Sequence, residues 1–251
     1  GWMSRADGRS DDALRPISIQ MNVQRNPEGS VLYRCGETTV LIAASVSEKV
    51  PDWMRETGRG WLTAEYEMHP RANPERKRRD RQKGRIDGRS SEIQRLIGRA
   101  LRAAVDLDKL GERMITVDCD VLAADGGTRT ASITGGFVAT AMALDGLRRE
   151  GLVDKGVLRE PITAISVGLL ETSALLDLCY TEDRDAEVDL NVVGTPRGGV
   201  VEVQGTAEGA PIDRAHLDQM IDLALEAMPA LADAQRQALR TLDIDIDRLL
   251  A

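Results

Sequence analysis

Apolar and polar positions alternate through the first third of the chain, a pattern typical of half-buried β-strands. The alternation starts at 17–23, where Ile, Ile, Met and Val take every second position. Strand-like runs follow at 30–35 and 38–46, and the five residues 40–44 (VLIAA) are apolar on both faces, as in a central strand. Together with a further strand at 62–68, these patterns predict that the fold begins with a meander of strands.

Helical periodicity begins near Ser91, which forms a capping-box pattern with Gln94. Apolar residues then recur every three or four positions: Ile93, Leu96, Ile97, Ala100, Leu101, Ala104 and Val105. A β-branched apolar run at 115–122 predicts another strand. The pattern after it predicts a second amphipathic helix over about 132–150.

The second half of the chain returns to strand composition before it becomes helical again. Four strand-like segments are separated by turn residues: 162–170, 174–180, 188–193 and 200–204. A third helix, capped by Asp213, is predicted to stop at Pro229, and a last helix follows at about 231–242. Because there is no repeat and no linker, we expect one α+β domain over residues 1–251, with helices packed on mixed sheets.

The composition adds limits to this picture. Hydrophobic residues make up 42% of the chain and charged residues 29%, as in an ordinary soluble globular protein. There is no apolar run of about 20 residues and no signal-peptide pattern, so we expect no membrane contact. Cys35, Cys119 and Cys179 are odd in number and far apart, which favours reduced, buried thiols of a cytoplasmic protein. Gly1 and Trp2 precede Met3 and are interpreted as a cloning remnant.

The charge is unevenly distributed. A net charge of −8 argues against a protein that coats nucleic acid indiscriminately. Nine Lys or Arg residues nevertheless lie within 71–89, against three acidic residues. The segment 71–85 has no periodicity and predicts an exposed basic loop that contacts a polyanion, or else a solvated loop without such a role. With only seven aromatic residues in the chain, contacts with nucleic acid should be mainly to phosphates.

The glycine-rich stretch 124–136 (ADGGTRTASITGG) lies between a predicted strand and a predicted helix. The start of a helix presents unpaired N–H groups, which favour an anion. Gly126 and Gly127 allow a ligand to approach the backbone, Thr128 adds a hydroxyl, and Arg129 adds a two-pronged charged donor. The stretch alone is equally consistent with a phosphate or carboxylate site and with a simple turn.

Carboxylates provide the other candidate chemistry. Asp177 lies in the apolar, strand-like run LLDLCY, where a charge needs a partner. Residues 182–189 gather more acids, which fit either a Mg²⁺ site or a solvated acidic turn. Histidine is nearly absent and no Walker loop occurs, which disfavours a nucleophile–base hydrolase and a P-loop enzyme. An anion cradle, carboxylates and a basic loop together suit phosphoryl transfer.

Four long motifs closely resemble the ribonuclease PH family. They are RADGRSDDALRP at 5–16, GRSSEIQRLIGRALRAAVDL at 88–107, VDCDVLAADGGTRTASITGG at 117–136 and DLCYTEDRDAEVDLNVV at 177–193. The resemblance runs from about residue 5 to the end of the chain, in order and without large gaps. It implies a single RNase PH-type domain whose motif positions are all intact.

The resemblance also implies an activity and its site. The activity is phosphorolytic 3′→5′ exoribonuclease, or tRNA nucleotidyltransferase, in which inorganic phosphate attacks the terminal phosphodiester and a nucleoside 5′-diphosphate leaves. The implied phosphate-binding residues are Arg89, Gly127, Thr128 and Arg129. The implied catalytic residues and Mg²⁺ ligands are Asp177 and Asp183, with Asp189 as a weaker candidate. The basic loop would bind RNA through Arg71, Arg76, Lys77, Arg78 and Arg79.

The implied partners are tRNA precursors and other RNA 3′ ends, together with further copies of the chain in a hexameric ring built as a trimer of dimers. One alternative is a non-catalytic RNA-binding subunit of an exosome-like ring, which intact site residues disfavour. Another is a nuclease that uses water as the nucleophile. The products separate these hypotheses, because only phosphorolysis yields nucleoside diphosphates and only when phosphate is present.

Overall fold

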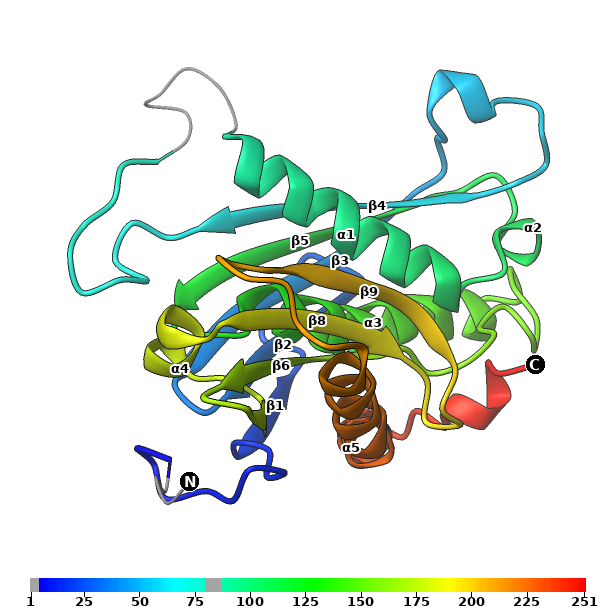
Figure 1. The fold of residues 1–251 in the computed structure, drawn as a ribbon. Coiled ribbons are helices and arrows are strands. Elements are labelled where there is room, and N and C mark those ends of the chain that lie inside the picture. The colour runs from blue at the N-terminus through cyan, green and yellow to red at the C-terminus, as the bar shows by residue number, and fades with distance from the viewer. Residues whose placement is uncertain (1–4, 80–86) are drawn as a thin grey trace.

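The structure, a computed structural model, describes residues 5–79 and 87–251 and is built on two β-sheets (Figure 1). The first sheet has five strands in the order β1 (Ile17–Met21), β2 (Gly29–Cys35), β3 (Thr38–Ser47), β5 (Met114–Ala123) and β4 (Trp61–Met68). β4 runs parallel to β5 and the other neighbours are antiparallel. The predicted strands of the first half are therefore confirmed, to within a residue or two at most ends.

The second sheet is antiparallel throughout. Its order is β7 (Ser173–Leu176), β6 (Thr163–Leu170), β8 (Val188–Gly194) and β9 (Val200–Ala207). The helices are α1 (Gly88–Ala104), α2 (Leu107–Leu110), α3 (Thr128–Arg149), α4 (Tyr180–Asp185) and α5 (Arg214–Arg240), with short 3-10 turns η1 (Asp52–Met54) and η3 (Ile246–Arg248). The predicted α+β class with mixed sheets and packed helices is confirmed.

Helix α3 joins the two sheets. It packs on β2 and β3 on one side and contacts β6 and α5 of the second sheet's layer. Eighteen of its 22 residues are buried, so it is a core helix and not the amphipathic one that the sequence predicts. Gly135 permits this packing, because a Cβ there would lie 2.5 Å from Ile42 Cδ1 and 3.0 Å from Tyr33 Cβ.

Helices α1 and α3 both begin earlier than predicted. α1 is capped by Asp87, whose Oδ1 accepts a hydrogen bond from the Ser90 N–H at 2.8 Å, and not by Ser91. α3 begins at Thr128, with Gly127 as its N-cap. Arg89 and Arg129 therefore lie inside the first turns of their helices, where the backbone N–H groups are free of intrahelical partners.

Two predictions in the second half are wrong. The strand predicted at 174–180 ends at Leu176, because Asp177 has a φ of +58°, and the chain then forms α4 where an acidic turn was expected. Pro229 lies inside α5 and does not end it. Proline removes one amide donor, but Met228 and Leu231 beside it are buried against the second sheet, and this packing maintains the helix.

All three cysteines are free; Cys35 and Cys119 are buried as expected, whereas Cys179 is only half-buried. No helix within residues 5–79 and 87–251 is long and apolar enough to cross a bilayer.

Candidate active site

The glycine-rich stretch forms a tight connection from β5 to α3. Gly126 and Gly127 have φ values of +79° and +75°, in the left-handed region that favours glycine. Gly126 also lies against the start of α4, because a Cβ there would collide with the carbonyl oxygen of Leu178. These glycines are needed for the backbone path and for the close approach of the two halves of the chain.

The start of α3 offers backbone donors. Gly127 has no side chain to cap the helix, so the N–H groups of the first turn remain available to a ligand. The Thr128 hydroxyl is buried and lies 2.9 Å from the Tyr66 hydroxyl. Arg129 Nη1 donates to Gln204 Oε1 at 3.1 Å, which fixes the guanidinium against β9. An anion would meet backbone N–H groups and a positioned arginine here.

A cavity of about 810 Å³ opens at this point. The first turns of α1 and α3 lie on one side of it, and α4, β8 and β9 lie on the other. The predicted site residues that line it are Lys77, Arg89, Gly127, Thr128, Arg129, Asp183 and Asp189. Its other lining residues are Met68, Asn73, Glu92, Ala124, Gly126, Ser166, Tyr180, Arg184, Ala186, Glu187, Asn191, Gln204, Gly205, Thr206 and Glu208. The structure thus brings the predicted phosphate-binding residues together in one cavity.

The cavity has a local excess of positive charge beside α3. Burial lowers the pKa of Arg129, and the neighbouring charge of Arg89 lowers it further. Within the described residues, neither arginine forms an ion pair at the 4.0 Å limit. Two neighbouring arginines that form no close ion pair, although Glu92 and Asp183 lie near enough to act on Arg129, favour a multiply charged anion such as phosphate.

Asp183 of α4 lines the same cavity. Although the residue as a whole is exposed, partial burial of its carboxyl raises its pKa. Glu208 raises this pKa further, whereas the charges of Arg129 and Arg89 lower it. The carboxylate therefore feels both arginines, as expected of a group that shares their ligand.

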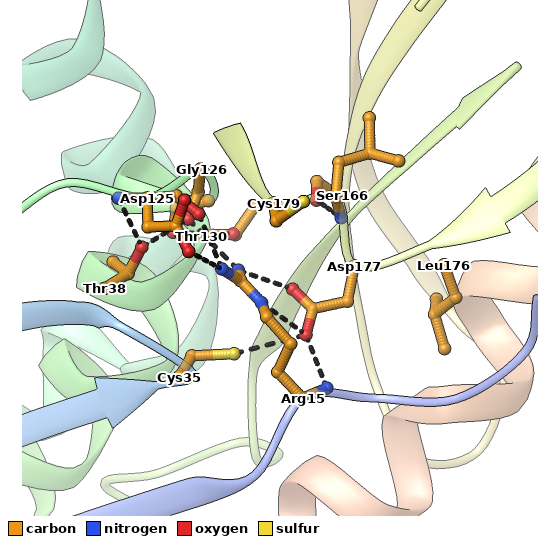
Figure 2. Close-up of polar contacts among 12 residues, drawn as sticks. Arg15, Cys35, Thr38, Asp125, Gly126, Thr130, Ser166, Leu176, Asp177 and Cys179 are labelled. Atoms are coloured by element: carbon orange, nitrogen blue, oxygen red, sulfur yellow. Dashed lines mark hydrogen bonds and ion pairs between the residues drawn. The ribbon is translucent and has the colours of Figure 1, made fainter. Parts of the chain in front are cut away.

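Asp177 has a different environment from the one predicted. Its side chain is 1% exposed, and it does not line the cavity. Arg15 donates to both carboxylate oxygens, from Nη2 to Oδ1 at 2.8 Å and from Nε to Oδ2 at 3.1 Å (Figure 2). The Arg15 N–H and Cys35 Sγ also donate to Oδ2, at 2.8 and 3.3 Å. Burial alone would raise the pKa of Asp177, but these hydrogen bonds and the charge of Arg15 hold it below its usual value.

These contacts, and its position outside the cavity, argue against the prediction that Asp177 is a Mg²⁺ ligand. Both carboxylate oxygens already accept hydrogen bonds from Arg15, and Oδ2 also accepts one from Cys35. Asp177 is a buried ion-pair partner, which is the need for a partner that the apolar sequence around it indicates.

Asp189 is the better second carboxylate. It is on β8, where Val188 and Leu190 are buried and Asp189 and Asn191 are half-buried, so the two polar residues share one face. Thr206 on β9 pairs with Asp189 across the sheet. Asp189, Asn191 and Thr206 all line the cavity. The period-two alternation VDLN could have identified this face from the sequence, had 188–193 been interpreted together with the acids before it.

The donor set suits Mg²⁺, although it is small. Among the described residues, no group of three or more His, Cys, Asp or Glu side chains could hold a metal. Mg²⁺ is commonly bound by one or two carboxylates together with water and phosphate oxygens. Asp183 and Asp189, both on the cavity wall, meet that requirement.

The described part of the basic loop is anchored beside the cavity. Ala72 is buried, and its carbonyl accepts from the Ala124 N–H at 2.9 Å, which ties the loop to the glycine-rich stretch. Lys77 lines the cavity. Arg71, Arg76 and Arg78 are exposed and do not line the cavity. Arg79 is half-buried near Asp120 of β5. Burial raises the pKa of Asp120, and the charge of Arg79 opposes this shift. The remainder of the predicted loop, residues 80–85, lies outside the described residues.

Comparisons with known proteins point to one family. The model for the 3′ exoribonuclease family matches twice, with its domain 1 at residues 13–144 and its domain 2 at 160–227. The sequence is 52% identical over 235 residues to "Ribonuclease PH" of Crocosphaera subtropica, a match that covers 94% of this chain and 97% of that protein.

Solved structures share the fold. Rrp46 of rice (Oryza sativa) superimposes with a TM-score of 0.76 at 19% identity, covering 94% of this chain and all of that one. A chain of the Archaeoglobus fulgidus exosome with RNA bound to the active site gives 0.75 at 24% identity, covering 92% of each chain.

Proposed function

The chain belongs to the RNase PH family of 3′ exoribonucleases, and on that basis we propose how its cavity performs the reaction. The activity is phosphorolytic 3′→5′ exonucleolysis of RNA, with inorganic phosphate as a substrate. The observation that supports the assignment of the site is the pair Arg89 and Arg129, which line one cavity from two helix starts and form no close ion pair among the described residues.

We assign phosphate to the start of α3. Arg89 and Arg129 would bind its oxygens, and the first-turn N–H groups after Gly127 would hold it in place. One phosphate oxygen then attacks the terminal phosphodiester of the RNA. The bond between the phosphorus of this phosphodiester and the 3′ oxygen of the preceding nucleotide breaks. The terminal nucleotide, now joined to the attacking phosphate, leaves as a nucleoside diphosphate. The shortened RNA takes a proton on its new 3′ hydroxyl.

We assign Asp183 and Asp189 to Mg²⁺, in place of the predicted pair Asp177 and Asp183. When bound there, Mg²⁺ would neutralise charge on the transferred phosphoryl group and on the leaving 3′ oxygen. We also propose that Asp183 assists proton transfer to that oxygen.

We propose that Lys77, the exposed arginines 71, 76 and 78 and the half-buried Arg79 guide the RNA strand by its phosphates. The substrates that the family resemblance favours are tRNA precursors and other RNA 3′ ends. It also favours a cytoplasmic protein that assembles as a hexameric ring, a trimer of dimers. Light scattering should then give a mass about six times the 27.4 kDa of one chain.

We further propose that residues 1–251 act as one folding unit, although the family models separate them into two parts. The support is α3, which is buried between the two sheets, and Gln235 of α5, whose Nε2 donates to the carbonyl oxygens of Thr134 and Ile162 at 3.1 and 2.9 Å. Neither sheet could keep its inner face covered without these shared helices.

Product analysis tests the function. Incubation of the purified protein with a 3′-tailed RNA and Mg²⁺ should release nucleoside diphosphates, and only when inorganic phosphate is present. Release of monophosphates without phosphate would show hydrolysis instead. RNA binding without any product would favour the non-catalytic ring subunit.

A further inference from the structure

Arg15 lies outside the cavity and connects two segments of the active site, the loop at 125–127 and the segment that begins at Asp177. Its side chain is 4% exposed, and Figure 2 shows its guanidinium between the 125–126 backbone and the carboxylate of Asp177. We infer that Arg15 is a positioning residue, which holds the loop at 125–127 in its phosphate-binding shape and uses Asp177 as its anchor. The inference rests on the proposed phosphate site at the start of α3.

The first half of the evidence is the contact with the loop. Arg15 Nη1 donates to the Asp125 carbonyl oxygen at 2.6 Å, and Nη2 donates to the Gly126 carbonyl oxygen at 3.1 Å. Thr38 Oγ1 donates to the same Gly126 oxygen at 2.6 Å and accepts from the Asp125 N–H at 2.9 Å. Two consecutive carbonyl groups are therefore held toward Arg15.

The direction of these carbonyl groups determines the direction of the donors. In a planar trans peptide, the N–H of each residue points opposite to the carbonyl of the residue before it. With the carbonyl groups of Asp125 and Gly126 held toward Arg15, the N–H groups of Gly126 and Gly127 point away from it. Both glycines line the cavity and Arg15 does not. The loop's donors are thus oriented before any anion arrives, which is the condition for strong electrostatic binding.

The second half of the evidence is the rigidity of the anchor. Asp177 has a left-handed φ of +58°, and its N–H donates to the Ser166 carbonyl oxygen at 2.8 Å. The next N–H, of Leu178, donates to Ser166 Oγ at 3.0 Å. α4 begins three residues after Asp177, and the Tyr180 N–H donates to Asp125 Oδ1 at 3.2 Å. The anchor of Arg15 is therefore fixed to the same short segment that presents Asp183.

Only an arginine can make this set of contacts. The guanidinium has five donors in a planar fork, and here it uses three nitrogen atoms on two carbonyl oxygens and one carboxylate. A lysine would keep the charge and could remain near Asp177, but its single nitrogen cannot hold both carbonyl groups in fixed directions.

Binding of inorganic phosphate, measured by calorimetry on the full-length protein, tests the inference without relying on turnover. In Arg15→Lys we expect the affinity to fall about 10- to 100-fold, the range typical of groups that orient a binding residue from behind. The KM for phosphate should rise by a similar factor, whereas the affinity for RNA should stay the same. Circular dichroism should be used to check that the variant is folded at the assay temperature.

Asp177→Asn provides a second variant in case Arg15→Lys does not fold. It keeps the shape of the anchor but weakens its hold on Arg15, so phosphate affinity should fall although Asp177 does not line the cavity. Its Mg²⁺ requirement should not change, whereas a metal ligand would show the opposite result. Arg113→Lys is the control: Arg113 is half-buried, pairs with Glu48 at 3.3 Å and donates to the Leu110 carbonyl oxygen at 2.9 Å, but it contacts neither residues 125–127 nor Asp177. It should lose stability and keep its phosphate affinity.

Unchanged phosphate affinity in a folded Arg15→Lys or Asp177→Asn protein would overturn the inference. An equal loss in Arg113→Lys would also overturn it, because the effect would then be general. If the wild type binds phosphate but releases no diphosphate, the proposed function fails while the role of Arg15 is still decided by the binding data. If the wild type binds no phosphate, the site and the inference fail together.

Discussion

Two groups of arginines lie near the active site, one around Asp177 and one in the cavity, and their charges are balanced in opposite ways. Arg5, Arg9 and Arg15 are buried or nearly so, and they share the carboxylates of Asp177 and Glu182 at distances between 2.8 and 3.7 Å. Arg89 and Arg129 line the cavity, where burial and then the like charge of Arg89 lower the pKa of Arg129. The protein supplies its own counter-ions where it builds structure, and leaves them out where a substrate must supply the charge.

The difference explains why neither group can be replaced by the other. A buried charge pair is costly to break, because the remaining partner is left without solvation. A pair of unneutralised arginines is costly to keep, and its cost is recovered when an anion binds. The first group therefore determines shape and the second determines affinity.

Removal of a cavity arginine should have the largest effect. We expect Arg129→Ala to lower phosphate-dependent release of nucleoside diphosphates by at least about 100- to 1000-fold, the usual loss for one positioned donor to a reacting anion. Binding of RNA should be largely retained, because the basic loop is untouched. Product release and filter binding measure the two quantities separately.

The matched control is Arg149→Ala at the far end of the same helix, where the arginine pairs with Asp145. It should show nearly normal turnover. Wild-type activity in Arg129→Ala would remove the role assigned to the cavity arginines.

Acid should separate the two groups with a smaller effect. Asp183 has a raised pKa, so it loses its charge at a pH above that of an ordinary aspartate. Asp177 has a lowered pKa, so its ion pair stabilises the fold fully above the ordinary aspartate value of 3.8 and is lost only as the pH falls through its still lower folded value. Phosphorolysis should therefore decline while the protein is still folded.

Turnover at saturating phosphate and limiting Mg²⁺, measured beside the far-UV circular dichroism of the same samples, tests this order. A folded Asp183→Asn protein should keep only a residual activity, and this activity should not show the decline at acid pH that protonation of Asp183 causes in the wild type. Loss of turnover and of structure at one and the same pH would contradict the separation.

The smallest effect is expected at the rim. Lys77→Gln should weaken RNA binding modestly and lower the slope of log affinity against log salt by about 0.7, the value for one phosphate contact on a single strand. Lys155→Gln, an exposed lysine away from the cavity, should leave the slope unchanged. Equal slopes in both variants would exclude Lys77 from the RNA path.

Most of the fold follows from local pattern. The alternation at 17–23, the doubly apolar run at 40–44 and the helical stripe from Ile93 to Val105 all predict elements that the structure contains. The errors occur where packing outweighs a local signal. Pro229 is a helix breaker by local chemistry, but burial of its neighbours against the second sheet keeps α5 continuous.

The candidate site was partly predictable for the same reason. Two glycines before a threonine and an arginine predict an anion site, because left-handed glycines and a helix start are local features. The partner of a buried carboxylate is not a local feature. The sequence shows that Asp177 needs one, but the partner is Arg15, 162 positions away, and no pattern around either residue indicates it.

What the sequence by itself determined is therefore the class of fold, the helix start that receives an anion, and membership of the family through four intact motifs. Only the tertiary structure decided which aspartates face the cavity and which arginines are already neutralised. The physical reason is that secondary structure and backbone donors depend on neighbours along the chain, whereas the charge state and availability of a side chain depend on what packs against it. Asp177 and Asp183 are both aspartates and lie close together in the sequence. Because their surroundings differ, we assign Asp177 a structural role and propose Asp183 for the reaction.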